Sequence, residues 1–246
     1  MVEFVEAIKR PLKTDLITVV LGTVFMGMRV LGVLLTGFGV IVGGILAALS
    51  LLVHGLGVEA SRRVMHKDHS MPHFDDYVDL FFTGLMVFVI GILYFLPAMI
   101  VMGMGIANSI PLILGMMGTA LWDPTMAVQG LLLLVLRGAV YGLLTLILSL
   151  LALIMLPVAI QLYAKNKELG DAFNFGHILN VVATPSYWMS WAVLAGYGVL
   201  LVGIAIIIST LSALVLTIPA FGLAMYLWWM TFYTLFAETT MEASVG

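Results

Sequence analysis

Three histidines and three aspartates lie close together in one polar stretch of this chain, His66, His69 and His73 with Asp75, Asp76 and Asp79. Imidazole and carboxylate groups are ligands of zinc and nickel, and histidine spacings of three and four residues share one face of a helix. Pro72 would interrupt such a helix. We therefore predict a solvated connection that holds no metal ion, with a metal site or a pH sensor as the alternatives.

Two arginines, Arg29 and Arg137, stand alone in long apolar stretches. A charged group at the centre of a bilayer costs about 3 kcal/mol on insertion scales, so it normally faces a cavity, a partner or the interface. We predict that both arginines lie in the outer half of the membrane and reach the outer headgroups. The alternative is an outer vestibule of Arg29, Arg137 and Asp123 that attracts anions in a symmetric oligomer.

A gate or hinge is a second candidate site, formed by Gly103, Gly105 and Asn108, although an ordinary turn explains the same residues. Catalytic chemistry has little support in the sequence. The chain has no cysteine, and general acid–base catalysis needs titratable groups held in a pocket. Since no such group lies in the middle of a predicted span, we expect neither an enzyme nor a cofactor.

The apolar composition defines the class of protein. Hydrophobic residues make up 63% of the 246 positions and charged residues 9%, and residues 80–122 contain no Lys, Arg, Asp or Glu. Only lipid can take up so much apolar surface in a chain of this size. The net charge of −3 gives no indication of nucleic-acid binding.

We predict an all-α, polytopic transmembrane helix bundle with six spans in three hairpins and with interfacial amphipathic helices. The single integral membrane domain, 1–246, divides into the following segments: a cytoplasmic amphipathic helix at 1–14, hairpin 1 at 15–57, a cytoplasmic amphipathic segment at 58–79, hairpin 2 at 80–163 with an outer connection at about 105–125, a second cytoplasmic amphipathic segment at 164–184, hairpin 3 at 185–237 and a cytoplasmic tail at 238–246.

The basic residues orient this bundle. Eight of the ten Lys and Arg residues fall on one side of the six-span arrangement, at Lys9, Arg10, Lys13, Arg62, Arg63, Lys67, Lys165 and Lys167. Short loops rich in Lys and Arg stay in the cytoplasm. We therefore expect a multi-pass protein with both termini in the cytoplasm.

Aromatic residues precede the second hairpin with helical periodicity. Phe74, Tyr77, Phe81 and Phe82 fall on one face of a predicted helix, and aspartates occupy the other face. Such a helix lies along the membrane interface with its aromatic face in the headgroup region.

Two sequence motifs resemble a known family. The first runs from Glu59-Ala-Ser-Arg-Arg-Val-Met through Met71-Pro-His-Phe-Asp-Asp-Tyr-Val-Asp-Leu-Phe-Phe-Thr-Gly-Leu to Tyr94-Phe-Leu-Pro, and the second is Tyr163-Ala-Lys-Asn-Lys-Glu-Leu-Gly-Asp-Ala-Phe-Asn-Phe. Both are similar to the multi-spanning prokaryotic membrane proteins of domain-of-unknown-function family 4013, with a departure at His73, where an acid is expected. The resemblance implies a prokaryotic cell membrane and brings no catalytic residues.

Three function classes follow from these observations. The first is a homo-oligomeric channel or facilitator, which the sequence favours. The second is a non-catalytic membrane scaffold or accessory subunit that organises lipid or a partner membrane protein, and the third, less favoured, is a lipid-processing enzyme. The expected partners are membrane lipids, further copies of the chain and an unidentified membrane protein, and nucleic acid is not expected.

Overall fold

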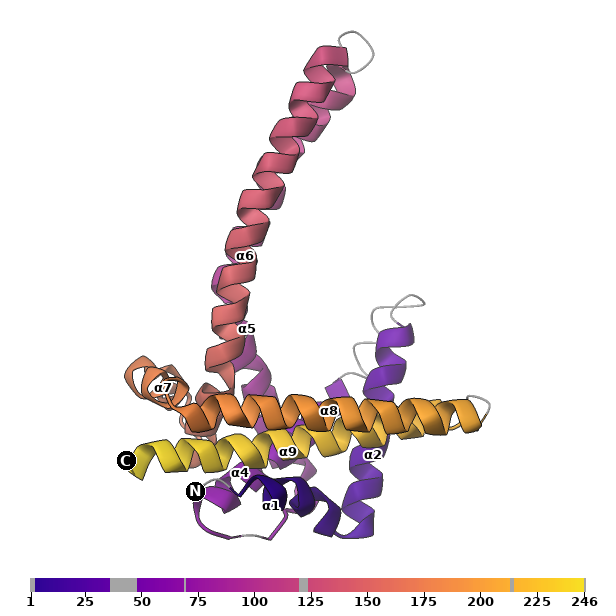
Figure 1. The fold of residues 1–246 in the computed structure, drawn as a ribbon, viewed down its shortest axis with the longest axis vertical. Helices are drawn as coiled ribbons and strands as arrows, with labels where there is room; N and C mark the ends of the chain where they lie inside the picture. The colour runs from indigo at the N-terminus through magenta and orange to yellow at the C-terminus, as the bar shows by residue number, and fades with distance from the viewer. Residues whose placement is uncertain (1–2, 36–47, 69, 120–123, 213–214, 246) are drawn as a thin grey trace. The chain divides into compact units, whose positions relative to one another are not determined.

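The computed structural model describes residues 3–35, 48–68, 70–119, 124–212 and 215–245, and these residues are almost entirely helical (Figure 1). In chain order the elements are α1 (Phe4–Lys9), the 3-10 helix η1 (Arg10–Lys13), α2 (Leu16–Leu35), α4 (Leu51–Met65), α5 (Tyr77–Thr119), α6 (Pro124–Asn166), the 3-10 helix η2 (Leu169–Phe173), α7 (Phe175–Val182), α8 (Pro185–Leu211) and α9 (Thr217–Val245).

Short polar residues begin several of these helices. Asp15 accepts a hydrogen bond from the Thr18 amide at 3.0 Å ahead of α2, and Asp76 accepts from the amides of Val78 and Asp79, both at 3.0 Å, ahead of α5. The Thr184 side chain accepts from the Tyr187 amide ahead of α8, where Pro185 occupies the first turn. Such caps satisfy amide groups that lack a partner within the helix.

Four described helices are long and apolar enough to cross a membrane, at 77–118, 125–166, 185–211 and 217–243. A fifth follows if α1 and η1 are joined to residues 16–32 of α2, across a bend of 96°. The six-span arrangement remains a prediction, because α4 has only 15 residues and residues 36–47, which precede it, lie outside the described parts. The described part of the chain is thus all-helical, with four to five long apolar helices.

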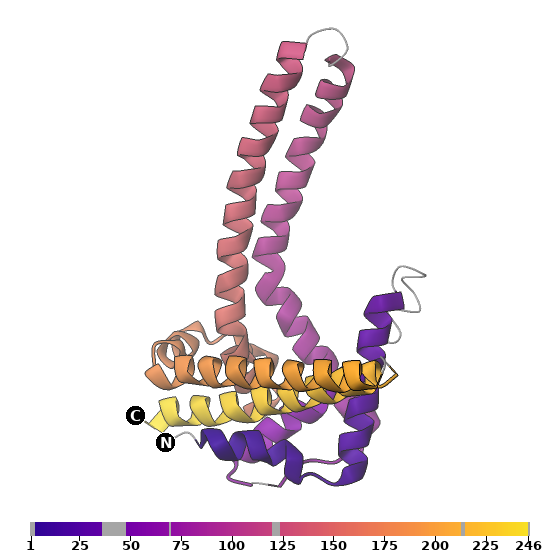
Figure 2. The same cartoon turned by 45° about the vertical axis from the view of Figure 1, so that its right-hand side comes forward.

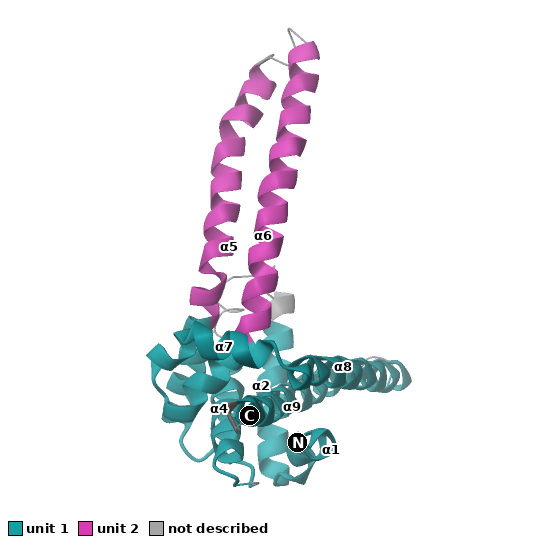
Figure 3. Ribbon diagram, turned by 60° about the vertical axis from the view of Figure 1, so that its left-hand side comes forward, with its two compact units in different colours: residues 1–90, 157–246 teal, residues 91–156 magenta. Residues whose placement is uncertain are grey.

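The chain divides into two compact units, which Figure 3 colours separately. Unit 1 comprises residues 1–90 and 157–246, and unit 2 comprises residues 91–156.

Helix α9 forms the centre of unit 1. It packs against α1, η1, α2, α4, α7 and α8, and 67% of its most apolar stretch is buried, compared with 17% for α5. Glycines allow close approach: a Cβ atom on Gly22 of α2 would lie 2.2 Å from the Tyr226 ring, and one on Gly57 of α4 would lie 2.1 Å from the Tyr233 ring. Small residues at such contacts are typical of packed membrane helices.

Unit 2 is a helical hairpin in which the second part of α5 lies beside the first part of α6 (Figures 2 and 3). A Cβ atom on Gly105 would lie 2.8 Å from Cβ of Tyr141, and one on Gly130 would lie 2.5 Å from Met116. Most of the other side chains along this hairpin are exposed and apolar, as expected for helices that face lipid.

The predicted outer connection at 105–125 is wrong for most of its length. Helix α5 continues through Pro97 and Pro111 to Thr119, and α6 begins at Pro124. Each proline removes one backbone donor, but apolar surroundings favour helix over irregular backbone because an unpaired polar group has no water to bind. The two prolines therefore did not end the helix.

Three other helices extend into segments predicted to lie in the cytoplasm, and the membrane boundaries themselves stay predictions. Helix α4 extends past residue 57 to Met65, where Glu59 pairs with Arg63 at 3.7 Å. Helix α5 begins at Tyr77 within the predicted cytoplasmic segment. Helix α9 continues through the predicted tail to Val245, and Glu238 is buried there against Arg10.

Glycines at the contact of α4 with α5 provide a test of this packing. A Cβ atom on Gly84 would lie 1.9 Å from the Leu51 carbonyl oxygen, whereas a Cβ atom on Gly91 of the same helix would meet nothing within 4 Å. We predict that Gly84→Ala destabilises the protein by about 1–3 kcal/mol through overpacking. Gly91→Ala, the matched control, should be neutral or stabilising by up to about 1 kcal/mol. Thermal unfolding in detergent measures both changes, and equal melting temperatures would contradict this packing.

Candidate functional site

A buried polar cluster joins three helices of unit 1. The guanidinium Nη1 of Arg29 on α2 lies 3.1 Å from Nε2 of His54 on α4, and Nδ1 of His54 lies 3.1 Å from the Tyr233 hydroxyl on α9. The Trp229 ring meets the His54 ring edge to face, with ring centroids 4.5 Å apart. In this cluster the Arg29 guanidinium and the Tyr233 hydroxyl both contact the His54 imidazole. The Trp229 ring packs against the same imidazole.

The chemistry of arginine fixes the proton positions in this cluster. A guanidinium group can only donate hydrogen bonds, so His54 Nε2 must accept from Arg29. The imidazole is then neutral with its proton on Nδ1, and that N–H donates to the Tyr233 oxygen. Ser61 of α4 donates to the Tyr233 carbonyl oxygen at 3.0 Å. Arg29, His54 and Tyr233 therefore hold α2, α4 and α9 together.

The three predicted vestibule residues lie in different parts of the chain. Arg29 belongs to unit 1, where it binds His54, and Arg137 belongs to unit 2, where its Nη1 donates to the Asn108 carbonyl oxygen at 3.0 Å. Asp123 lies outside the described residues. A vestibule role for these residues therefore stays a prediction.

The predicted gate residues all lie within helix α5. Asn108 donates from its side chain to the Tyr141 hydroxyl at 2.8 Å, and Gly105 packs beneath the same side chain. Gly103 has open space around it. Asn108 and Gly105 therefore contribute to the packing of α5 against α6. A gate or hinge formed by the three residues stays a prediction.

The predicted aromatic face lies only partly on the helix assigned to it. Phe74 precedes α5, is buried, and stacks against Tyr77 with ring centroids 6.2 Å apart. Tyr77 and Phe82 are exposed, and Phe81 is half-buried. An interfacial position for these rings remains a prediction.

The histidine series is divided among different partners. Nδ1 of His66 donates to the Arg62 carbonyl oxygen at 2.8 Å, and Nδ1 of His73 lies 2.6 Å from Asp15. His69 lies outside the described residues. Among the residues that the structure describes, no group of three or more His, Cys, Asp or Glu side chains is arranged to hold a metal ion.

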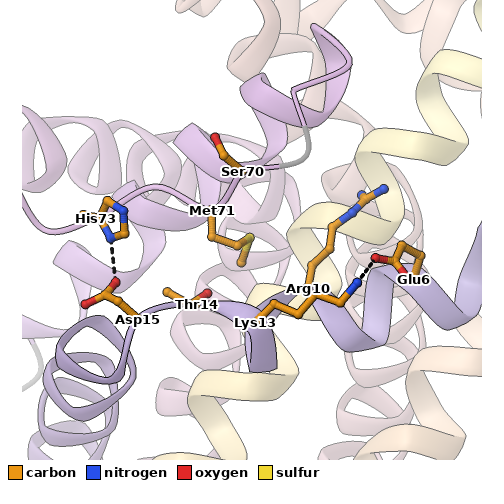
Figure 4. Close-up of a pocket in the computed structure, with 8 residues that line it drawn as sticks. All are labelled: Glu6, Arg10, Lys13, Thr14, Asp15, Ser70, Met71 and His73. Atoms are coloured by element: carbon orange, nitrogen blue, oxygen red, sulfur yellow. Dashed lines mark hydrogen bonds and ion pairs between the residues drawn. The ribbon is translucent and has the colours of Figure 1, made fainter.

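A surface pocket of about 330 Å³ lies where the N-terminal segment meets the loop that precedes α5 (Figure 4). Eight residues line it: Glu6, Arg10, Lys13, Thr14, Asp15, Ser70, Met71 and His73. The Lys13 ammonium binds the Glu6 carboxylate, and His73 binds Asp15. Charged groups of both signs therefore surround the pocket.

A buried ion pair supports one wall of this pocket. Nη1 of Arg10 lies 2.6 Å from Oε1 of Glu238, and both side chains are at least nine-tenths buried. The other oxygen of Glu238 accepts from the Glu3 amide at 2.9 Å. The sequence predicts Arg10 only as one of the basic residues on the cytoplasmic side. One signal was available in the sequence: Glu238 is the first acid after Asp171, so it comes at the end of a long stretch without Lys, Arg, Asp or Glu.

Asp15 is the titratable group at the edge of the pocket with the most contacts. Hydrogen bonds from Thr18 lower the pKa of Asp15 below its ordinary value, and the contact with His73 lowers it further. Asp15 therefore carries its negative charge when it caps α2 and binds His73 in the loop.

The fold and these sites define a helical membrane protein in which polar side chains hold the helices together. The chain belongs to a family of proteins of unknown function, DUF4013, whose model matches residues 38–210. No curated protein and no solved structure matches the chain. The family resemblance noted in the sequence is thus confirmed.

The buried cluster can be tested by removing one hydroxyl group. Tyr233→Phe leaves the Nδ1–H of His54 without its acceptor, so we predict a loss of about 1–3 kcal/mol in stability. A double-mutant cycle of Tyr233→Phe with Arg29→Met should show a coupling energy of about 0.5 kcal/mol or more, because both residues bind the same imidazole. Thermal unfolding of the four proteins gives this energy, and strict additivity would contradict a shared network.

The Asp15 contact predicts a pH-dependent contribution to stability. Because the pKa of Asp15 is lowered in the folded protein, its contribution is present above its ordinary value of 3.8 and disappears as the pH falls through the lower folded value. Asp15→Asn retains a helix-capping side chain and lacks this titration. The melting temperatures of the two proteins should converge as the pH falls below about 4. A constant difference across this range would contradict the prediction.

Proposed function

We propose that this protein is a non-catalytic membrane scaffold or accessory subunit whose α5–α6 hairpin contacts a partner membrane protein. In this proposal it lies in the prokaryotic cell membrane with both termini in the cytoplasm. The observation that carries the proposal is the length and exposure of the hairpin.

The hairpin of unit 2 contains residues 91–119 of α5 and 124–156 of α6, which correspond to about 45–50 Å of helix at a rise of 1.5 Å per residue. The hydrocarbon core of a bilayer is about 30 Å thick. Apolar side chains are exposed along unit 2. Near the end of α5 and the start of α6 they include Leu114, Met117, Leu131 and Leu132. More apolar surface is therefore exposed than one upright crossing would cover, and a partner protein could bury the excess.

The polar contacts within unit 1 also favour a scaffold. The Arg29–His54–Tyr233 cluster joins three helices, the Ser190 and Thr239 hydroxyls lie 2.7 Å apart between α8 and α9, and the Trp228 indole donates to the Leu194 carbonyl oxygen at 3.3 Å. These groups bind one another. This supports a structural use of the polar residues in unit 1.

A homo-oligomeric channel or facilitator is the second candidate, and the glycines of the hairpin favour it. A Cβ atom on Gly103, Gly115, Gly118, Gly138 or Gly142 would meet nothing within 4 Å. Glycine surfaces of this kind permit the close approach of a helix from another copy. Arg137 is exposed on the same hairpin and would then act on ion selectivity.

Liposome flux distinguishes the two candidates. We predict that the purified protein, reconstituted in liposomes, moves ions and small solutes no faster than protein-free liposomes do, because a scaffold has no conducting pathway. Arg137→Ala should behave in the same way. Conductance above background whose selectivity changes in Arg137→Ala would overturn the scaffold proposal in favour of the channel.

Photo-crosslinking in native membranes gives the complementary result. A photoreactive residue in place of Leu132 or Met117, both exposed, should yield one discrete adduct with a different protein. The same residue in place of Val158, which is fully buried, is the control and should yield none. Adducts only with further copies of the chain would favour the oligomeric channel.

A further inference from the structure

We propose that the pocket lined by Glu6, Arg10, Lys13, Asp15 and His73 binds the phosphoethanolamine headgroup of a membrane lipid. This goes beyond the scaffold function, which places no ligand in this pocket.

The charges that line the pocket match a zwitterion. The lining contains the Lys13 ammonium and the carboxylates of Glu6 and Asp15, and Arg10, which is paired with Glu238, lies in the wall. A ligand with one phosphate and one ammonium group would place charges of both signs against partners of opposite sign. The pocket volume of about 330 Å³ lies at the small end of the range typical of small-molecule sites, about 300–1,000 Å³.

The ion pairs at the pocket edge can exchange partners readily. In the Lys13–Glu6 pair the side chains are 61% and 37% exposed, and in the His73–Asp15 pair they are 51% and 39% exposed. Exposed pairs of this kind contribute little to stability. A phosphate can therefore replace Glu6 as the partner of Lys13, and an ammonium group can replace His73 as the partner of Asp15, at small cost.

The pocket wall, in contrast, is fixed. Arg10 is 3% exposed and Glu238 is 9% exposed, and removing one member of a buried pair is costly because it leaves the other charge without a partner. The N-terminal segment is therefore held in place beside α9 while the groups at the pocket edge change partners. A pocket with one fixed wall and exchangeable edge pairs is suited to reversible binding.

The apolar surroundings of the pocket point to a lipid as the source of the headgroup. Leu12, Leu16 and Ile17 are 61%, 78% and 71% exposed in the segment that contributes Lys13 and Asp15. Exposed apolar residues interspersed with charged ones are typical of segments that lie in the headgroup region. Met71, which is buried, adds an apolar surface to the pocket lining itself.

The lining residues also predict which amine is recognised. A primary ammonium group has three N–H donors and can bind the carboxylates of Glu6 and Asp15 directly. A quaternary choline group has no donor and is usually held by aromatic rings. The eight lining residues include no Phe, Tyr or Trp. Ethanolamine should therefore be preferred to choline.

Native mass spectrometry of the full-length protein in detergent tests this inference. We would add phosphatidylethanolamine or phosphatidylcholine with identical acyl chains and measure the fraction of protein that retains one lipid. The ethanolamine lipid can donate hydrogen bonds to charged carboxylates that choline cannot make, so we expect roughly tenfold stronger retention of the ethanolamine lipid. Equal retention of the two lipids would overturn the proposal.

Variants locate the binding in the pocket. Lys13→Gln and Asp15→Asn should each reduce retention of the ethanolamine lipid by roughly tenfold, and asparagine keeps the capping of α2. Lys9→Gln and Asp75→Asn are the matched controls, because both residues are exposed and neither lines the pocket. If the controls weaken retention as much as the pocket variants do, the proposed site is wrong.

Soluble O-phosphoethanolamine distinguishes a lipid from a free metabolite. We expect that it does not displace the lipid at equal concentration, because the acyl chains add apolar contact. Complete displacement under these conditions would overturn the assignment to a lipid.

Discussion

Buried polar groups in a bilayer must find their partners inside the protein, and in unit 1 several of these partners lie on helix α9. No water is present in the hydrocarbon region to bind an unpaired donor or acceptor. The Tyr233 hydroxyl binds His54, the Tyr233 carbonyl oxygen binds Ser61, and Thr239 binds Ser190. The positions of α2, α4 and α8 therefore depend on their contacts with α9, which is largely buried.

The same helix determines the geometry of the N-terminal pocket. Glu238 of α9 binds both Arg10 and the Glu3 amide, so the segment that lines one side of the pocket is attached to the core of unit 1. The opposite side comes from the loop around His73, which Asp15 holds. A surface site thus takes its shape from one buried ion pair and one exposed pair, and only the buried pair is expensive to break.

Local features of this structure could be predicted from the sequence, because they depend on neighbouring residues. The helical class follows from the apolar composition, and Asp15 and Thr184 stand ahead of helices α2 and α8 as capping residues do. The prolines were poor guides to helix ends: α5 continues through Pro97 and through Pro111, which lies in the predicted outer connection. Helix propensities measured in water overstate the cost of proline in a membrane helix. Irregular backbone in lipid costs more, because its polar groups have no water to bind.

Contacts between distant parts of the chain could not be predicted. His54 and Tyr233 are separated by 179 residues, and the amide of Glu3 is separated from its partner Glu238 by 235. Sequence periodicity describes neighbours within one helix, so it cannot identify a partner on another helix. Any of several helices could supply that partner. Glu238 follows a long uncharged stretch, but only the packing of α1 and η1 against α9 shows that Arg10 is its partner.

The order of the helices along the chain has a consequence for biogenesis. Because α9 is synthesised after α2 and α4, Arg29 and His54 enter the bilayer before the helix that completes their network exists. The early helices must therefore remain loosely packed, in contact with the insertion machinery or with lipid, until α9 has been synthesised and inserted. Assembly of unit 1 is completed only when α9 docks.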